Sequence, residues 1–485
     1  MRHFATRLDR QPGLRQIKDT TVPFGHHGCL NRWDSSMRRD MIRKYAAPVP
    51  RYTSYPTAPH FHAGIDAGVY RGWLAALPQG EPLSLYMHIP FCDSLCWFCG
   101  CHTRHTLKYD PVALYLEPLL KEVETIGHLV AGSSMVVEMQ WGGGSPTMLS
   151  GPDMARLVAA VREHFDVAPD FAFGVEIDPR GFDQERLATL AGNGLTRASI
   201  GVQDFDPVVQ AAINRCQSLA ETAAAVEALR AAGVGSINID LVYGLPHQTR
   251  ASVAETAAAV IGLKPERIAL FGYAHVPWMK KHQSMIDETI LAGPEERFAM
   301  ANRVASLLTA AGYMRIGFDH FALPGDSLAR VAAQGRLRRN FQGYADTPAD
   351  TIIGLGASAI GRLRQGYVQN AIATGDYMRR IGAQGLATAR GIALRGDDVL
   401  RGFVVERLMC DGVLSRGELD RRFGPAAGEV IGELADFAAA DTDGLIAEED
   451  GVFRLTPRGA VFVRSVCARL DPYLRKGTAR HSIAV

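Results

Sequence analysis

The chain has 485 residues, a formal net charge of +1 at pH 7 and a hydrophobic fraction of 47%. This length allows one large α/β domain with additions, or two domains that each bury a core. The balanced charge excludes a chain that is drawn as a whole to nucleic acid or anionic lipid, and no apolar run approaches the roughly 20 residues of a membrane-spanning helix.

Residues 1–50 are predicted to be a poorly ordered leader. They are rich in arginine but interspersed with aspartate, and they lack the apolar core of a signal peptide. Met37 or Met41 is an alternative start of the chain. Residues 51–80 begin with the polar and aromatic run Arg51-Tyr52-Thr53-Ser54-Tyr55-Pro56-Thr57, an unusual composition for a linker. Taken by itself, this run predicts a loop.

The most informative stretch follows an apolar run, Leu83–Pro90, that predicts a strand. Four of the eight cysteines fall within ten positions after it, and three of them, Cys92, Cys96 and Cys99, have the spacing CxxxCxxC. Three thiolates on one loop can hold three corners of a [4Fe–4S] cube and leave the fourth iron open to a substrate. A closed electron-transfer cluster usually has a fourth cysteine.

Zinc binding and disulfide pairing are less favoured for these cysteines. Structural zinc normally needs a second CxxC pair downstream, and none follows. Disulfide scaffolds are typical of short secreted chains. Cys101 leaves one alternative open, because its CxC step from Cys99 places a fourth thiol on the loop. Clustered thiols without a secretory signal predict a cytoplasmic protein.

The cysteine spacing after a strand resembles the signature of the radical S-adenosylmethionine (SAM) superfamily. Its extension to CxxxCxxCxC, preceded by the YxHIPFC pattern of Tyr86–Cys92, resembles the family of oxygen-independent coproporphyrinogen III oxidases. The resemblance extends from Tyr52 to about Leu474 and includes the RYTSYPT segment. It implies that residues 51–80 form an N-terminal arm over the active site, and that the cofactors are one [4Fe–4S] cluster and two molecules of SAM.

Beyond the cysteines, strands and helices alternate. A helix is predicted for Asp110–Leu129, whose apolar residues lie on one face despite Pro118. With the first strand there are six strand-like runs, of which the later five are Met135–Gln140, Phe171–Ile177, Arg197–Val202, Ser236–Val242 and Arg267–Phe271. Repeated βα units require parallel strands, and right-handed crossovers curl such a sheet. We therefore predict an α/β fold, an open six-stranded parallel β/α barrel of radical SAM type over residues 81–362.

Unusual residues follow these strands, at the edge on which barrel enzymes build their sites. The run Trp141–Thr147 contains three glycines, which let the backbone approach a ligand closely, although most such runs are only turns. It resembles the GGGTP element of the family. This implies contacts from Gly143, Gly144 and Ser145 to the methionine end of SAM, with Ser145 in place of the usual Thr.

Glu176 lies at the end of the third strand. A carboxylate there can simply cap the next helix, but Glu176 is inside an apolar run, where a charge needs a partner. The resemblance implies a contact with the first SAM and a part in proton transfer or hydrogen bonding. Our predicted catalytic residues are Glu176, Tyr86 and His88, and Tyr86 is also a predicted SAM contact.

Asn238 and Asp240 alternate along the fifth strand, so both side chains face the barrel interior. An inward polar pair costs desolvation energy and is more often functional than not. The resemblance implies that Gln203, Arg215 and Asp240 bind a second SAM beside Phe98 and Gly144, and that the Ala274 backbone and the Ile360 side chain contact the first.

From about Gly361 the βα alternation stops. Residues 363–485 are predicted to form a mainly helical lid domain with a small hairpin at Gly444–Thr456. Two helices and a hairpin resemble a winged helix, which would suggest DNA binding. Acidic residues at the turn, Glu448, Glu449 and Asp450, would repel phosphate, so a lid over the barrel is favoured.

The resemblance also implies the reaction. A 5′-deoxyadenosyl radical made from SAM would remove hydrogen from two propionate side chains of coproporphyrinogen III, which lose carbon dioxide and become the vinyl groups of protoporphyrinogen IX in haem biosynthesis. The tetra-anionic substrate would need cations, and Arg51, Arg315 and Arg339 are candidates. We expect a monomer, an electron donor such as a flavodoxin or ferredoxin system, and no nucleic-acid or membrane partner.

Two alternative functions stay open on the sequence. A radical-SAM-like haem chaperone or a haem-degrading methyltransferase has the same scaffold, but the chaperone typically lacks the cysteine at Cys101 and the RYTSYPT arm. A cluster-bearing regulator or electron carrier has only the C-terminal helix-and-hairpin unit in its favour.

Overall fold

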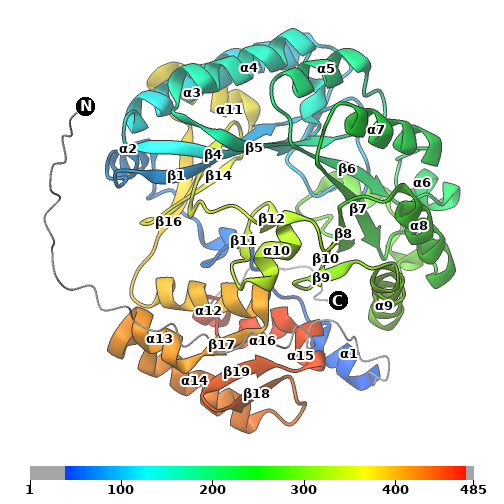
Figure 1. Ribbon diagram of the computed structural model, residues 1–485, viewed down its shortest axis with the longest axis vertical. Coiled ribbons are helices and arrows are strands. Elements are labelled where there is room, and N and C mark those ends of the chain that lie inside the picture. The colour runs from blue at the N-terminus through cyan, green and yellow to red at the C-terminus, as the bar shows by residue number, and fades with distance from the viewer. Residues whose placement is uncertain (1–38, 477–485) are drawn as a thin grey trace, which may run out of the picture.

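The computed structural model describes residues 39–476 of the chain. Its centre is a sheet of twelve strands in the order β16-β15-β14-β13-β1-β4-β5-β6-β7-β8-β10-β9. The sheet is curved, helices cover its outer face, and the C-terminal part of the chain lies across the open side of the curve (Figure 1). No helix among the described residues is both long and apolar enough to cross a membrane.

The six strands predicted from the sequence are confirmed. Each pairs in parallel with the next one along the chain. They are β1 (Glu81–Ile89), β4 (Ser134–Gly143), β5 (Val167–Ile177), β6 (Arg197–Gln203), β7 (Ser236–Tyr243) and β8 (Arg267–Gly272). Their carboxyl ends therefore meet at one edge of the barrel, where most of the residues singled out in the sequence lie.

The sheet extends beyond these six strands on both sides. β13 pairs in parallel with the free side of β1 and three antiparallel strands follow it, while two antiparallel strands continue from β8. The additions are β9 (Met314–Ile316), β10 (His320–Ala322), β13 (Thr351–Leu355), β14 (Ile360–Leu363), β15 (Gly366–Asn370) and β16 (Thr388–Ala393). Because β15 and β16 belong to the large sheet, we propose a domain boundary near Leu394 instead of the one predicted between residues 362 and 363.

Helices pack on the outer face of the sheet (Figure 1). The predicted helix at 110–129 is α3 (Asp110–Val130), which buries Leu116 and Leu119 on its inner face although Pro118 lies within it. The other helices of this part are α2 (Ala67–Ala75), α4 (Gly151–His164), α5 (Gln184–Gly192), α6 (Pro207–Ala212), α7 (Leu219–Ala231), α8 (Arg250–Leu263), α9 (Pro294–Ala310) and α11 (Thr374–Gln384).

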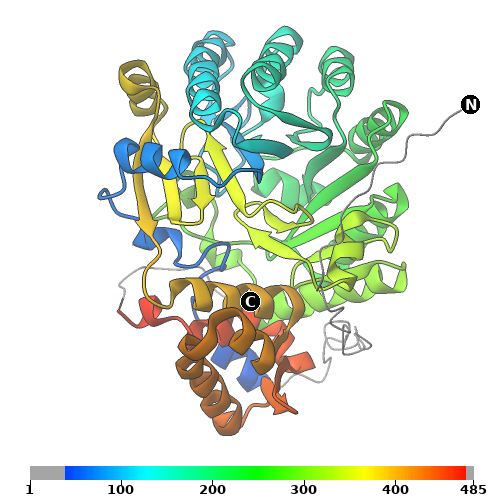
Figure 2. The same cartoon turned by 60° about the vertical axis from the view of Figure 1, so that its left-hand side comes forward.

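The C-terminal part has its own apolar core and lies beside the barrel in both views (Figure 1, Figure 2). The predicted hairpin is confirmed as β18 (Ile446–Glu449) and β19 (Val452–Leu455), and β17 (Val413–Ser415) adds a third strand. The helices are α12 (Asp398–Asp411), α13 (Arg416–Phe423), α14 (Ala427–Ala440), α15 (Pro457–Val461), α16 (Val463–Arg469) and α17 (Pro472–Lys476).

Residues 39–50 belong to the fold, contrary to the poorly ordered leader predicted for them. Helix α1 (Arg39–Tyr45) buries Met41, Ile42 and Tyr45, and these side chains join the core of the C-terminal part. This helix has only seven residues, too few for its apolar pattern to stand out in the sequence. The rest of the predicted leader, residues 1–38, lies outside the described residues.

A segment that we call the arm (residues 49–62) crosses the open side of the curved sheet. Near one end, Arg51 Nη2 donates a hydrogen bond to Gly272 O at the end of β8. At the other end, His62 pairs with Gly391 of β16. The arm thus connects two margins of the barrel. The remaining short elements are β2 (Phe91–Cys92), β3 (Arg104–His105), β11 (Arg338–Asn340), β12 (Gly343–Ala345) and α10 (Ser327–Ala333).

Candidate functional site

The cysteine loop begins where β1 ends, at the carboxyl edge of the barrel. β2 and β3 pair in parallel and bring the two ends of the loop together. Within the loop, Leu95 O accepts a hydrogen bond from Asn214 Nδ2 at 2.9 Å, and Trp97 N donates one to Ile213 O at 2.9 Å. Both partners follow α6, so the loop is fixed against the segment between β6 and α7.

Two of the predicted ligands, Cys92 and Cys99, receive hydrogen bonds from their own loop. Thr103 Oγ1 donates to Cys92 Sγ at 3.1 Å, and the Cys101 N–H donates to Cys99 Sγ at 3.3 Å. Donors of this kind stabilise a thiolate, which is the form that binds metal. All seven cysteines in the described part of the chain are free of disulfides.

The third predicted ligand, Cys96, is buried and faces two guanidinium groups. Arg215 Nη1 lies 3.5 Å and Arg180 Nη2 3.6 Å from its Sγ. Asp178 binds both arginines, and although burial opposes it, they lower the pKa of this carboxyl. Sequence reasoning missed the roles of Asp178 and Arg180. Their position directly after β5, in the same run as Glu176, is the signal that could have found them.

A cavity of about 170 Å³, which we call the cysteine cavity, lies beside the three thiols. The predicted site residues that line it are Cys92, Cys96, Phe98, Cys99, Gly143, Gly144, Glu176, Gln203, Arg215 and Asp240. Within residues 39–476, no three His, Cys, Asp or Glu side chains are arranged so that together they could hold a single metal ion. An iron–sulfur cluster fits better, because its cysteines bind separate irons. Three sulfur atoms, each with an N–H or O–H donor, therefore fit a [4Fe–4S] cluster.

The glycine run at the end of β4 lines this cavity. Gly143 has φ = +118°, and a Cβ there would lie 2.7 Å from the His88 ring. A Cβ on Gly144 would lie 2.5 Å from the Phe91 carbonyl oxygen. Larger residues therefore do not fit here. Ser145 donates its N–H to Phe91 O at 2.7 Å and is not among the residues that line the cavity.

Glu176 lines both the cysteine cavity and a second one of about 240 Å³ deeper in the barrel, which we call the inner cavity. Its carboxylate accepts a hydrogen bond from the Gly143 N–H at 3.1 Å. Burial and the nearby Asp240 carboxylate raise the pKa of Glu176 to about 7. Near neutral pH this group can therefore either donate or accept a proton.

Asp240 and Asn238 face the barrel interior, as their alternation on β7 predicted. Asn238 Nδ2 donates to one Asp240 oxygen at 2.7 Å, and Ser199 Oγ donates to the other at 3.2 Å. Asp240 and Ser199 line both cavities. Gln203, at the end of β6, has φ = +71°, a strained conformation of the kind found at ligand sites.

Tyr86 and His88 lie on the same face of β1, next to the cysteine cavity rather than in its lining. Tyr86 Oη is 3.1 Å from His88 Nδ1, and His88 Nε2 is 2.8 Å from the His102 carbonyl oxygen. A carbonyl only accepts, so Nε2 carries the proton and Nδ1 accepts from Tyr86. Burial lowers the pKa of His88 to about 4, so the ring is neutral at pH 7.

Two predicted SAM contacts, Ala274 and Ile360, also lie outside the cysteine cavity. The Ala274 carbonyl accepts a hydrogen bond from Gln283 Nε2 at 3.2 Å, and the same nitrogen donates to Phe98 O at 2.8 Å. Ile360 begins β14 and packs against a cluster that contains Tyr367. The structure thus places Ala274 beside the cysteine loop and Ile360 on the far side of β13.

The loop after β8 contains further contacts that the sequence did not indicate. Lys280 Nζ donates to Cys101 O at 2.9 Å, and His282 Nε2 lies 2.7 Å from Cys99 O. These side chains hold the outer half of the cysteine loop. They belong to no motif and come together only through the fold, so spacing alone could not reveal them.

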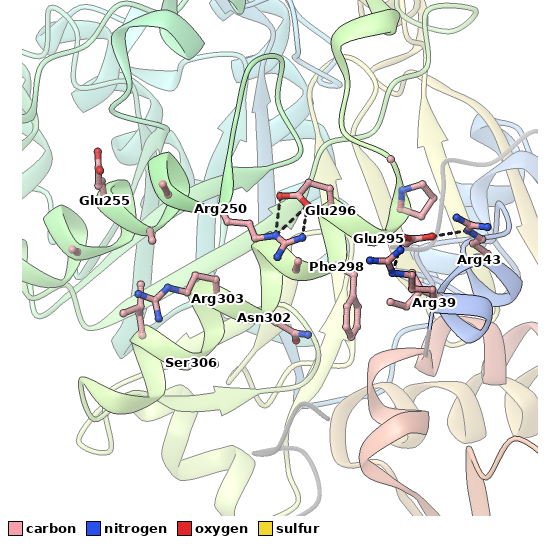
Figure 3. A pocket seen from close by; sticks show the side chains of 18 residues that line it. Arg39, Arg43, Arg250, Glu255, Glu295, Glu296, Phe298, Asn302, Arg303 and Ser306 are labelled. Carbon is pink, nitrogen blue, oxygen red and sulfur yellow. Dashed lines mark hydrogen bonds and ion pairs between the residues drawn. The ribbon is translucent and has the colours of Figure 1, made fainter. Parts of the chain in front are cut away.

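A larger cavity, of about 1340 Å³, lies among α1, α8 and α9 (Figure 3). Two of its arginines are already paired, since Arg250 binds Glu296 and Arg43 binds Glu295, both at 2.6 Å. The predicted site residues gather instead at the smaller cysteine cavity, so size does not identify the site in this molecule.

Comparison with known proteins agrees with this geometry. The family model of the radical SAM superfamily matches residues 86–260, and the model of the HemN C-terminal domain matches residues 394–462. The chain is 44% identical over 450 residues to the oxygen-independent coproporphyrinogen III oxidase of Bradyrhizobium diazoefficiens, covering 93% of this chain and 100% of that relative.

More distant relatives give the same result. The Escherichia coli protein of the same name is 37% identical over 445 residues, which cover 92% of this chain and 96% of the relative. The solved structure of the Escherichia coli coproporphyrinogen III oxidase, described as a radical SAM enzyme, matches with a TM-score of 0.86 at 35% identity, over 92% of this chain and 100% of that chain.

Proposed function

The chain belongs to the family of oxygen-independent coproporphyrinogen III oxidases, within the radical SAM superfamily, and on this premise we propose its reaction. It converts two propionate side chains of coproporphyrinogen III into vinyl groups, with loss of carbon dioxide, and so forms protoporphyrinogen IX. The observation that carries this proposal is the likeness over more than nine-tenths of the chain, joined to three thiols at the carboxyl edge of the barrel. The same likeness favours the oxidase over a haem chaperone, a methyltransferase or a regulator.

Cys92, Cys96 and Cys99 would hold the [4Fe–4S] cluster, and Cys101 would not. When bound, the cluster and SAM supply the radical that removes hydrogen from the substrate. Arg180 and Arg215 would donate hydrogen bonds to the Cys96 sulfur, and Thr103 to the Cys92 sulfur. Positive charge and donors around these sulfurs would stabilise added negative charge there.

The first SAM would lie along the glycine run. Backbone groups of Gly143, Gly144 and Ser145 would contact its methionine end, because side chains are absent or turned away there. Glu176 would accept a hydrogen bond from its amino group, as it already accepts one from a backbone N–H. Tyr86, the Ala274 backbone and Ile360 would complete the contacts.

We propose a second SAM at Gln203, Arg215 and Asp240, beside Phe98. The support is that all four residues line the cysteine cavity with Glu176. Asp240 is a carboxylate with hydrogen bonds but no ion pair among the described residues, so it suits a cationic sulfonium or amino group.

Proton movements would involve Glu176, Tyr86 and His88. The Tyr86 hydroxyl donates to a neutral His88 ring, which in turn donates to a carbonyl, so this pair forms a fixed chain of donors. Burial and the charge on Glu176 raise the pKa of Tyr86. Tyr86 therefore keeps its proton and acts as a hydrogen-bond donor, while Glu176 is the group that exchanges a proton near neutral pH.

The arm and the C-terminal part would exclude water from the reaction. Both lie on the open side of the curved sheet, where the barrel itself has no strand (Figure 1). A shielded site protects a reactive radical from side reactions. Within the predicted segment 51–80, the part that belongs to the arm (residues 49–62) would thus serve as a cover, and the C-terminal part as the lid that holds it.

The finer assignments of partners are also proposals. An electron donor such as a flavodoxin or ferredoxin system would reduce the cluster, and the chain would act as a monomer in the cytoplasm. The support for a reducing compartment is the set of seven free thiols among the described residues.

Product analysis tests the proposed reaction. Reconstituted protein is incubated anaerobically with SAM, a reductant and coproporphyrinogen III, and the porphyrins are separated after oxidation. A tricarboxylic intermediate followed by protoporphyrin is the expected result. Stoichiometric haem binding without turnover would support the chaperone instead, and reduction of the cluster without any porphyrin product would support a regulator or carrier.

A further inference from the structure

Two arginines from different parts of the fold bind four successive carbonyl groups of the arm. Arg464, on α16, donates from Nη2 to Val49 O at 2.5 Å and from Nε to Pro50 O at 3.0 Å. Arg339, on β11, donates from Nη2 to Arg51 O at 3.2 Å and from Nε to the next carbonyl, that of Tyr52, at 3.3 Å. The backbone at this point is therefore fixed from both sides.

The conformation of Tyr52 turns the arm at this point. Its φ is +49°, which is uncommon for an aromatic residue, and its buried hydroxyl donates to Asp471 Oδ2 at 3.1 Å. The Tyr52 side chain thus points to the C-terminal part, while the Arg51 side chain reaches in the other direction to the end of β8. Strain of this kind, held by surrounding hydrogen bonds, is found where a side chain must be placed for function.

The Arg51 side chain is accessible to water although it lies deep enough in the molecule for burial to lower its pKa. Its guanidinium donates one hydrogen bond among the described residues, to Gly272 O at 3.2 Å. No carboxylate of residues 39–476 forms an ion pair with it. Arginine has five N–H donors, so most of those of Arg51 have no hydrogen-bond partner among the described residues.

Positive charge is in excess around this group. Asp319, the carboxylate whose charge acts on Arg51, already binds His320 Nδ1 at 2.5 Å. Arg339 is only 7% exposed and its Nη1 has no hydrogen-bond partner. Burial and the like charge of Arg51 lower the pKa of Arg464 to about 9. A buried excess of guanidinium charge is costly unless an anion joins it.

The surroundings connect this group to the candidate site. Gly272 ends β8 two residues before Ala274, a proposed SAM contact, and Tyr243 at the end of β7 lies near Arg51. His320 and Tyr344, which adjoin Asp319 and Arg339, line the inner cavity. An anion bound to Arg51 would thus lie between the arm and the carboxyl edge of the barrel.

We propose that Arg51 binds a carboxylate group of the substrate, and that Arg339 and Arg464 are positioning residues that hold its backbone in place. This rests on the proposed function, since it assigns the ligand as one propionate of a tetrapyrrole polycarboxylate. A guanidinium and a carboxylate form paired, parallel hydrogen bonds, which would fix the orientation of the macrocycle. Of the three arginines considered from the sequence, Arg339 binds backbone carbonyls and Arg315 is buried with its donors on Gly317 and Phe318, so Arg51 is the accessible one.

Ligand binding by the reconstituted holoenzyme tests this assignment without relying on turnover. The probes are coproporphyrin III, which carries the same four carboxylates as the substrate, and its tetramethyl ester, which carries none, in the same detergent. The variants are Arg51→Gln and Arg51→Lys, which keeps the charge, with Arg303→Gln on the exposed face of α9 as the matched control. Iron content and SAM cleavage without substrate are measured in each.

Arg51→Gln is expected to raise the Kd for coproporphyrin III about tenfold or more, Arg51→Lys less, and Arg303→Gln not at all. The Kd for the ester should be the same in all four proteins. Wild-type affinity of Arg51→Gln for coproporphyrin III would overturn the assignment, and so would an equal loss of ester binding, which would show that Arg51 only supports the arm. A wild-type protein that binds coproporphyrin III through Arg51 but forms no product would refute the proposed reaction and leave the anion site standing.

Discussion

Two charged regions inside the barrel satisfy their charges in different ways. At the amino ends of the strands, the residues Glu138, Arg197, Arg267, Asp326 and Asp346, which we call the basal network, bind one another. Arg267 binds Asp326 at 2.8 Å and Asp346 at 2.9 Å, and Arg197 binds Asp346 at 2.7 Å. At the carboxyl ends, Glu176 and Asp240 form no ion pair among residues 39–476.

The comparison shows that similar charged residues can either stabilise the fold or take part in chemistry. Although burial opposes it, Arg267 and Arg197 lower the pKa of Asp346 to about 2, so the protein itself supplies the cations that keep this carboxylate charged. Burial and the nearby Asp240 carboxylate raise the pKa of Glu176 to about 7, and no cation of residues 39–476 forms an ion pair with it. Buried carboxyl groups that form no ion pair within the protein are available to bind a ligand. Groups with such shifted pKa values cluster at functional sites.

Removing a thiol from the carboxyl edge should have the largest effect. Cys96→Ala takes away one corner of the proposed cluster together with the sulfur that two arginines face. We expect loss of the brown absorbance, of bound iron and of all SAM cleavage, measured on anaerobically reconstituted protein. Cys101→Ser is the matched control and should keep near-normal iron content, and equal iron loss in both variants would overturn the three-ligand assignment.

Breaking the basal network should cost stability and leave the chemistry intact. Asp346→Asn leaves two partly buried guanidinium groups without their shared carboxylate, and we expect the free energy of unfolding to fall by about 3 kcal/mol. Iron content and SAM cleavage per folded chain should change little. Because the folded-state pKa of Asp346 lies below its ordinary value of 3.8, its stabilisation is present above that pH and is lost as the pH falls toward 2.

Urea unfolding of both proteins across the acidic range checks this prediction, since variant and parent should converge in stability as the pH falls. A variant that is as stable as the parent at neutral pH but has lost SAM cleavage would contradict the distinction between the two regions.

Glu122 lies outside both regions. It tests whether a buried carboxyl group without a cationic partner must belong to a functional site. Glu122, on α3, accepts hydrogen bonds from Gly356 N, Asn370 Nδ2 and Tyr377 Oη at 2.7, 2.7 and 2.8 Å, and burial raises its pKa to about 7. The stabilisation from its proton is complete below 4.5, its ordinary pKa, and is lost as the pH rises toward 7. The parent should therefore lose about 2 kcal/mol of unfolding free energy between about pH 5 and about pH 7.

Glu122→Gln should remove most of that pH dependence, in urea unfolding at the two pH values. The variant should also bind SAM and iron like the parent, since Glu122 supports a turn and touches no proposed ligand. A pH dependence that survives the substitution would show that another group titrates in this range.

The smallest expected effect concerns the proposed second SAM. Asp240→Ala should spare cluster assembly and stability but weaken binding of one SAM about tenfold, because a charged hydrogen-bond partner is lost. Isothermal titration of SAM into the reconstituted protein would show two sites in the parent and one strong site in the variant. Asp240→Asn, which keeps the shape, should fall between them, and unchanged turnover in both variants would remove the two-SAM assignment.

Much of the fold could be predicted because its signals are local. The six parallel strands are long apolar runs, each followed by a helix, and period and chain order settle their arrangement. β13 escaped prediction because it has only five residues and pairs with β1, which is far away in sequence. Helix α1 escaped because its apolar face is completed by the distant C-terminal core.

Of the candidate site, only the residues in local motifs could be predicted from the sequence. The cysteine spacing and the glycine run are local motifs, so Cys92, Cys96, Cys99 and Gly143 could be named from the sequence. The contacts of Arg180 with Cys96, and those of the loop after β8 with Cys99, depend on which strand ends meet in space. Spacing contains no information on such contacts, and only the family resemblance or the structure supplies it.

The central claim is a cube held by three protein thiolates with one iron open to SAM. Its most direct test is anaerobic determination of iron and acid-labile sulfide in reconstituted protein, with electron paramagnetic resonance spectra of the reduced protein before and after SAM is added. We predict about four irons and about four sulfides per chain, and a spectrum that SAM changes. Absence of a cluster, or a cluster whose spectrum SAM leaves unchanged and which loses iron when Cys101 is replaced by Ser, would contradict it.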